Sequence, residues 1–127
     1  MKQDERVYVK LEEHGHNKSY LTTNPQLIIA IYRKYMLYSV DMALLQFLIW
    51  KNDANTEHAP VHVSYEDLAQ LFNVSKSTII RAIKHLIAVE LIVKVNERFG
   101  RSKTAYKPNV GLLHRLLFEH LRDYGEN

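Results

Sequence analysis

Residues 75–84 place hydroxyl groups and cationic groups within three turns of a possible helix. Hydroxyl, ammonium and guanidinium groups all donate hydrogen bonds, and the cationic ones attract phosphate. A guanidinium can also bond O6 and N7 of guanine together, which distinguishes that base. These residue types therefore point to recognition of a nucleic acid. The candidate side chains are Ser75, Lys76, Ser77, Thr78, Arg81 and Lys84.

A helix over 75–89 would separate these groups from an apolar face, because residues three and four apart lie on the same side. Ser75 is a good residue to begin it, since its hydroxyl can accept a bond from the N–H of Ser77 or Thr78. The exposed N–H groups of the first turn would favour a phosphate. The side that faces the core would carry Ile79, Ala82, Ile83 and Leu86.

Within this helix, individual roles can be predicted. Arg81 is the expected base contact, and Lys84, further along, is the expected backbone contact. Lys76, Ser77 and Thr78 could reach bases or phosphates. Ile80 is interpreted as a core residue, with contact to a thymine methyl as the alternative.

A second helix is predicted immediately before, over residues 65–72. Ser64 would cap it, with Asp67 three residues later in a variant of the capping box. Only Asn73 and Val74 separate Phe72 from Ser75, so the turn between the helices is sharp. Asn tolerates the left-handed backbone that such a turn needs.

This pair of segments resembles the helix-turn-helix family of DNA-binding modules. Ala69 has the place of the family's small residue in the first helix, and Asn73 that of its usual turn glycine. Val74 follows as the apolar residue of the turn. Apolar positions recur in the second helix at Ile79 and Ala82.

The residues that follow resemble the winged-helix variant of that family. Strands are expected over 91–95 and 104–108, around a basic turn that contains Gly100. The resemblance covers 39–108 and implies a mainly α fold with a small β-sheet. It also implies that the helix from Ser75 enters the major groove and that the wing lies on the minor groove or the backbone. The wing candidates are Arg98, Gly100, Arg101, Ser102 and Lys103.

The remaining elements are predicted from caps and spacing. An alternating run at 6–11 suggests a strand or arm, and Asn24-Pro25 begins a helix over 25–37. A nearly all-apolar helix over 40–50, capped by Ser39, belongs in the core. A short strand is expected at 61–63. The predicted divisions are 1–38 (arm and helix), 39–108 (winged helix-turn-helix) and 109–127 (C-terminal helix).

The C-terminal segment carries a broad leucine stripe over 110–124. Two explanations are possible: it packs on the helix at 25–37, or it pairs with a second copy of the chain. We expect a two-fold homodimer, since such dimers read two half-sites. The dimerisation candidates are Leu113, Leu116, Leu117 and Leu121.

Composition excludes several classes of function. The 127 residues include no cysteine, so disulfides and thiol chemistry are absent. No signal peptide or membrane span is seen, and a cytoplasmic location away from the membrane is expected. The net charge is +3, yet residues 73–107 hold eight basic and only two acidic side chains. Such a block on an otherwise acidic chain favours a polyanionic partner.

The seven histidines do not predict a metal site. His14 and His16 have no third ligand nearby, and His114 and His120 would not share a helix face. No phosphate-binding loop or nucleophile elbow occurs, so no enzymatic activity, cofactor or small-molecule ligand is predicted.

The function expected from the sequence is a double-stranded DNA-binding transcriptional regulator, specifically a repressor. A plasmid or phage replication initiator or partition adaptor is the alternative, because residues 64–92 resemble plasmid replication proteins and Gly100–Lys103 resembles the wing of partition repressors. A winged helix that contacts only proteins is a second alternative, which would leave the basic side of the helix without a purpose.

Overall fold

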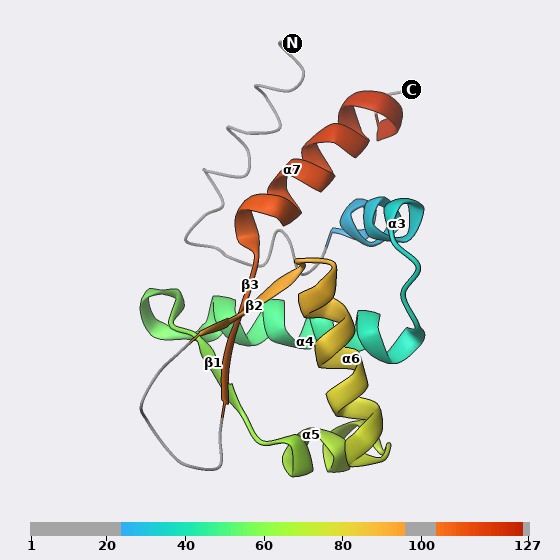
Figure 1. Cartoon of the computed structure of the whole chain (residues 1–127). Helices are drawn as coiled ribbons and strands as arrows, with labels where there is room; N and C mark the ends of the chain where they lie inside the picture. Colours follow the sequence, from blue (N-terminus) through green and yellow to red (C-terminus); the bar gives the residue numbers. More distant parts are fainter. Residues whose placement is uncertain (1–23, 96–103, 126–127) are drawn as a thin grey trace. The chain divides into compact units, whose positions relative to one another are not determined.

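The computed structural model describes residues 24–95 and 104–125 (Figure 1). The chain divides into two compact units. One unit comprises residues 37–109, and the other joins the N-terminal residues up to 36 to the C-terminal residues from 110.

The described residues of the unit 37–109 form three α-helices and a three-stranded sheet. Its helices are α4 (Ser39–Ala54), α5 (Tyr65–Phe72) and α6 (Lys76–Ala88), with a short 3₁₀ turn, η1 (Thr56–His58), after α4. The strands are β1 (Val61–Val63), β2 (Ile92–Val95) and β3 (Thr104–Pro108). This order confirms the predicted fold class, mainly α with a small β-sheet.

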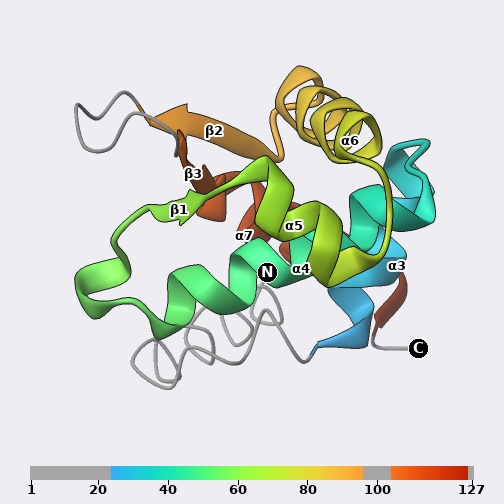
Figure 2. The ribbon, with the colours of Figure 1, turned by 90° about the horizontal axis from the view of Figure 1, so that it is seen from below.

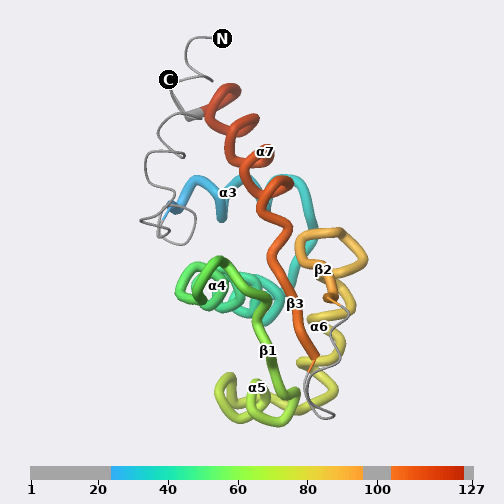
Figure 3. Tube along the Cα trace, turned by 90° about the vertical axis from the view of Figure 1, so that its left-hand side faces the viewer, coloured from blue at the N-terminus to red at the C-terminus, as the bar shows by residue number. Residues whose placement is uncertain are grey.

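The sheet is antiparallel with β3 in the centre (Figure 3). Val61 on β1 faces Tyr106 on β3, and Val93 on β2 faces Lys107. The buried phenol of Tyr106 lies 2.7 Å, oxygen to oxygen, from that of Tyr65 on the first turn of α5. Burial and this hydrogen bond raise the pKa of the Tyr106 phenol above its ordinary value. The paired phenols thus fasten the start of α5 to the central strand.

Helix α4 forms the centre of the core, as its apolar sequence predicts. Leu44, Leu45 and Leu48 are fully buried, and α4 packs against α6 and β3. The predicted end at residue 50 is wrong, because the helix continues to Ala54. The added turn holds Asn52, whose buried amide donates to the carbonyls of His58 and Ala59 at 3.1 and 3.0 Å. That side chain ties the end of α4 to the segment leading into β1.

The N-terminus of α4 is capped differently from the prediction. Tyr38, and not Ser39, is the N-cap residue. Its backbone N–H donates to Asp41 Oδ2 at 3.0 Å, and His85 Nδ1 on α6 lies 2.8 Å from the same oxygen. The Tyr38 and His85 rings are 6.2 Å apart. One buried carboxylate therefore both starts α4 and links it to α6.

The second unit contains α3 (Pro25–Lys34), α7 (Val110–His120) and a π-helical turn, η2 (Leu121–Gly125). Asn24 caps α3 as predicted, accepting a bond from the Gln26 N–H at 2.9 Å. The helix ends at Lys34 instead of residue 37. Helix α3 packs against α7 (Figure 1). Leu113, Leu116 and Leu117 on α7 are buried, as are Leu27, Ala30 and Ile31 on α3.

Packing of α3 on α7 covers much of the leucine stripe, as the first of the two explanations holds. Packing within the chain accounts for Leu113, Leu116 and Leu117, and Leu121 is half-buried. The premise that these leucines need a second copy is therefore wrong, and the homodimer stays a prediction. Two polar contacts also join α3 to the C-terminal residues. His120 Nε2 on α7 lies 2.8 Å from Gln26 Oε1, and Arg33 donates to the Tyr124 hydroxyl on η2 at 2.7 Å.

We predict that Asp41→Ala lowers the free energy of unfolding by about 1–3 kcal/mol, because it leaves the part-buried Tyr38 N–H and the His85 imidazole without their acceptor. Asp41→Asn keeps an oxygen for the Tyr38 N–H, and the loss should be smaller. Urea unfolding followed by circular dichroism measures both. Equal stability of Asp41→Ala and the parent chain would show that the carboxylate does not link the helices.

Candidate nucleic-acid interface

The turn between α5 and α6 sets the direction of the candidate recognition helix (Figure 2). Asn73 has φ 56° and ψ 47°, which is the left-handed conformation predicted for it. The N–H of Val74 returns to the Ala69 carbonyl at 3.0 Å, in the pattern of a Schellman motif. The chain can therefore leave α5 and enter α6 within three residues.

Ser75 begins α6 as the sequence predicts. Its Oγ accepts from the Thr78 N–H at 3.1 Å and lies 2.8 Å from the Thr78 hydroxyl. The Ser77 hydroxyl is 3.1 Å from the same oxygen. These three hydroxyls form one polar cluster on the first turn, beside backbone N–H groups that lack a carbonyl partner within the helix.

Helix α6 has the two faces expected of it. Ile79, Ala82, Ile83 and Leu86 are buried, and Ile80 is half-buried. The opposite side, called here the basic face, is exposed and consists of Lys76, Ser77, Arg81 and Lys84. Arg81 Nη2 lies 3.5 Å from the Thr78 hydroxyl, a long contact that restrains the guanidinium only weakly. Four of the six side chains that are predicted to meet a nucleic acid are thus gathered on one exposed side.

A carboxylate that sequence reasoning missed lies at the start of this face. Glu66, in the first turn of α5, forms an ion pair with Lys76, in which Nζ lies 2.7 Å from Glu66 Oε1. Its other oxygen accepts from the Ser64 hydroxyl at 3.1 Å. Three hydrogen bonds to the carboxylate lower the pKa of Glu66 from 4.5 to about 2. The bond from Lys76 has the largest effect, and those from the Glu66 backbone N–H and the Ser64 hydroxyl follow. The spacing of ten residues across a tight turn is the signal that could have revealed the pair.

A Schellman-like return also ends α6. Glu90 has φ 65°, and the N–H of Leu91 bonds the Leu86 carbonyl at 3.0 Å. The Asn109 amide donates to the Glu90 carbonyl at 2.9 Å. A glutamate in this conformation is unfavourable by about 1–2 kcal/mol, so surrounding contacts must hold it there.

The wing candidates Arg98, Gly100, Arg101, Ser102 and Lys103 lie outside the described residues. The strands that bracket them are described. Lys94 on β2 is exposed, and Lys107 on β3 is half-buried. Strands β2 and β3 are paired from Ile92 to Val95, which confirms the hairpin that the sequence predicts.

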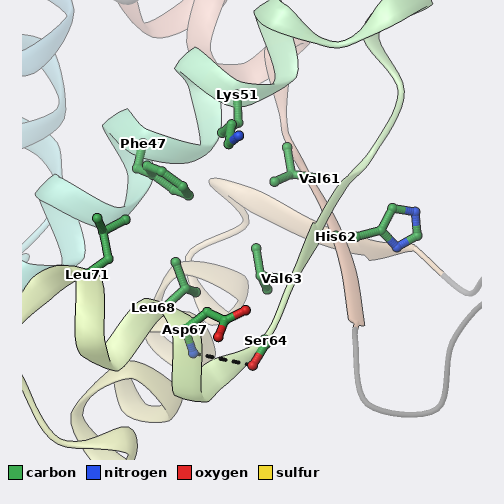
Figure 4. A pocket seen from close by; sticks show the side chains of 9 residues that line it. All are labelled: Phe47, Lys51, Val61, His62, Val63, Ser64, Asp67, Leu68 and Leu71. Carbon is green, nitrogen blue, oxygen red and sulfur yellow. Dashed lines mark hydrogen bonds between the residues drawn. The ribbon is translucent and has the colours of Figure 1, made fainter.

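A shallow groove of about 120 Å³ lies between α4, β1 and α5 (Figure 4). Its walls are mainly apolar, and the dashed contact in Figure 4 is the Ser64 cap of α5, at 3.3 Å from the Asp67 N–H. The lining residues are Phe47, Lys51, Val61, His62, Val63, Ser64, Asp67, Leu68 and Leu71. Among the described residues, no three His, Asp or Glu side chains gather where they could ligate one metal ion.

Residues 37–92 match the family model of the helix-turn-helix domain. The helices and the three-stranded sheet of residues 37–109 have the winged helix-turn-helix fold. The match begins one residue before the Tyr38 cap and ends at the first residue of β2, while β3 completes the sheet of the winged form. No curated protein matches the sequence.

A solved structure is also similar to the chain. The adhesin competence repressor from Streptococcus pyogenes is 18% identical, with a TM-score of 0.48. The alignment covers 78% of this chain and 66% of that one, so this chain spans about two thirds of the repressor's length. Within residues 24–95 and 104–125, no helix of the chain is both long and apolar enough to cross a bilayer.

We predict that the turn of the winged helix tolerates Asn73→Gly but not Asn73→Val. Glycine adopts positive φ without strain, whereas a β-branched residue is forced into it at a cost of about 1–2 kcal/mol. Urea unfolding of both variants gives the difference. A valine variant as stable as the glycine variant would contradict a required left-handed turn.

We predict that Glu66 titrates near pH 2 in the parent chain and closer to pH 4.5 in Lys76→Met. Because its folded pKa is lowered, the contribution of the pair to stability is complete above pH 4.5 and is lost as the pH falls towards 2. Carbon NMR of the side-chain carboxyl measures this titration. Lys84→Met, which removes a charge from the same helix, is the control and should leave the pKa low.

Proposed function

We propose that the winged helix-turn-helix domain binds duplex DNA sequence-specifically and acts as a transcriptional regulator, specifically a repressor. The observation that carries the proposal is the basic face of α6, which is exposed while the opposite face of the same helix is buried. A helix of this kind fits the major groove, with its N-terminal side chains at the base edges.

The chemistry of the face supports separate roles for its residues. Arg81 lies one turn into the helix and can bond guanine O6 and N7 together. Lys84 lies nearly one turn further and is suited to a backbone phosphate. The hydroxyl cluster of Ser75, Ser77 and Thr78 adds donors beside the positive end of the helix dipole, which also favours phosphate.

The wing extends the proposed contact. Arg98, Gly100, Arg101, Ser102 and Lys103 would lie on the minor groove or the backbone, since arginine is attracted to a narrow A·T-rich minor groove. A replication initiator or partition adaptor would use the same face of α6. The two roles differ in the DNA that is bound, either a promoter operator or a repeated array at an origin.

The experiment that tests the function is selection of bound fragments from the parent genome, followed by affinity measurements over a range of salt concentrations. Each phosphate that the protein neutralises contributes about −0.9 to the slope of log K against log salt. We expect binding that weakens steeply with salt. Recovered promoter sites would support the regulator, and repeated arrays the initiator. A chain that retains no fragment at low salt would refute DNA binding.

We predict that Arg81→Ala and Lys84→Ala weaken binding in different ways. Arg81→Ala should reduce discrimination against altered sites by about 1–3 kcal/mol. Lys84→Ala should weaken all sequences alike and make the salt slope shallower by about 0.9. Lys51→Ala removes the same charge from α4 of the same unit and is the control. Identical, sequence-independent losses at Arg81 and Lys84 would contradict Arg81 as a base contact.

A further inference from the structure

The carboxylate of Glu66 is held at the start of the basic face. Its Oε1 accepts from Lys76 Nζ at 2.7 Å, and its Oε2 accepts from Ser64 Oγ at 3.1 Å. The same serine oxygen caps α5 by accepting from the Asp67 N–H at 3.3 Å. Glu66 also lies in the first turn of α5, where the helix dipole favours a negative charge. Contacts on both oxygens thus fix the position of the negative charge.

The Lys76–Glu66 pair contributes only a little to stability. The side chains of Lys76 and Glu66 are 53% and 67% exposed, and water screens an ion pair at such a site. The pair does neutralise one of the cations on the face that is proposed to meet DNA. A phosphate and the Glu66 carboxylate would therefore compete for the same ammonium.

We propose that Glu66 is a positioning residue that holds Lys76 in the unbound protein and lowers the affinity of the basic face for any DNA phosphate. This inference rests on the proposed function. When DNA approaches, either Lys76 leaves Glu66 for a phosphate, or Lys76 stays and the face has one cation fewer. In the first case an unpaired carboxylate remains close to the DNA backbone and offsets the charge of the new contact, so in both cases the face neutralises one phosphate fewer. Both cases weaken binding without regard to sequence.

The restraint matters for specificity, because a regulator must reject a large excess of unrelated DNA. Sequence-independent affinity comes almost entirely from phosphate contacts. A carboxylate that reduces this part leaves a larger share of the affinity to contacts such as that of Arg81. Glu66 would then change the ratio of phosphate contacts to base contacts without itself touching a base.

The test compares Glu66→Gln with the parent chain on an operator duplex and on an unrelated duplex, over a range of salt concentrations. Freeing Lys76 should add one phosphate contact, so the salt slope becomes steeper by about 0.9 on both duplexes. At 0.1 M salt such a contact corresponds to a gain in affinity of at most about eightfold. Glu57→Gln makes the same change of charge on the exposed η1 turn and should leave the slope unchanged.

The double variant Glu66→Gln with Lys76→Ala separates a local effect from a general one. It should bind like Lys76→Ala alone, because the gain requires the freed ammonium. An unchanged slope in Glu66→Gln, or a gain that survives the loss of Lys76, would overturn the inference. A loss confined to the operator would overturn it too, since it would show Glu66 accepting a bond from a cytosine amino group.

The parent chain distinguishes this result from failure of the proposed function. If the parent binds neither duplex at low salt, DNA binding is refuted and the role of Glu66 falls with it. If the parent binds DNA and Glu66→Gln has the same salt slope as the parent, only the role of Glu66 is refuted. Thermal unfolding of each variant checks that affinities are compared between folded proteins.

Discussion

The left-handed backbone at Asn73 is the constraint on which the winged helix depends. Because the chain turns sharply at Asn73 and Val74, only three residues separate the end of α5 from the start of α6. That short distance brings the first turns of the two helices together, so Glu66 on α5 can reach Lys76 on α6. It also leaves Ser75 at the one position where its hydroxyl can cap α6. The geometry of the basic face follows from one backbone conformation.

The other end of α6 is fixed by contacts from distant parts of the chain. Asp41 connects the start of α4 to His85, and the left-handed Glu90 turns the chain into β2. Asn109 then bonds the Glu90 carbonyl from the far side of the hairpin. Because α6 is held at both ends, its apolar face stays on the core. The same contacts keep its basic face turned to the solvent. Rigid support of this kind is what a helix needs in order to present side chains in a fixed register.

The features that sequence reasoning predicted are those with local causes. The Asn73 turn, the Ser75 cap and the two faces of α6 each depend on residues within one or two turns of one another. The contacts that it missed join residues far apart, as in Asp41 with His85 and Tyr65 with Tyr106. The leucine stripe shows the same limit. The stripe is visible in the sequence, but only the packing of α3 on α7 shows what covers Leu113, Leu116 and Leu117.

The charge pattern of the domain has a further consequence once these contacts are considered together. Residues 73–107 hold eight basic and two acidic side chains, so the count along this segment indicates a strongly basic face. Glu66, which lies outside the segment, nevertheless pairs with Lys76 and neutralises its charge. Arg81, by contrast, makes only a long contact with Thr78, so its guanidinium keeps its donors for another partner. Within the described residues, then, the cation best suited to read a base is weakly restrained, while the lysine at the helix start is held by a carboxylate. In the proposed complex with DNA, this arrangement would favour selective binding over the tightest possible binding, because it would weaken contact with the uniform backbone more than contact with the bases.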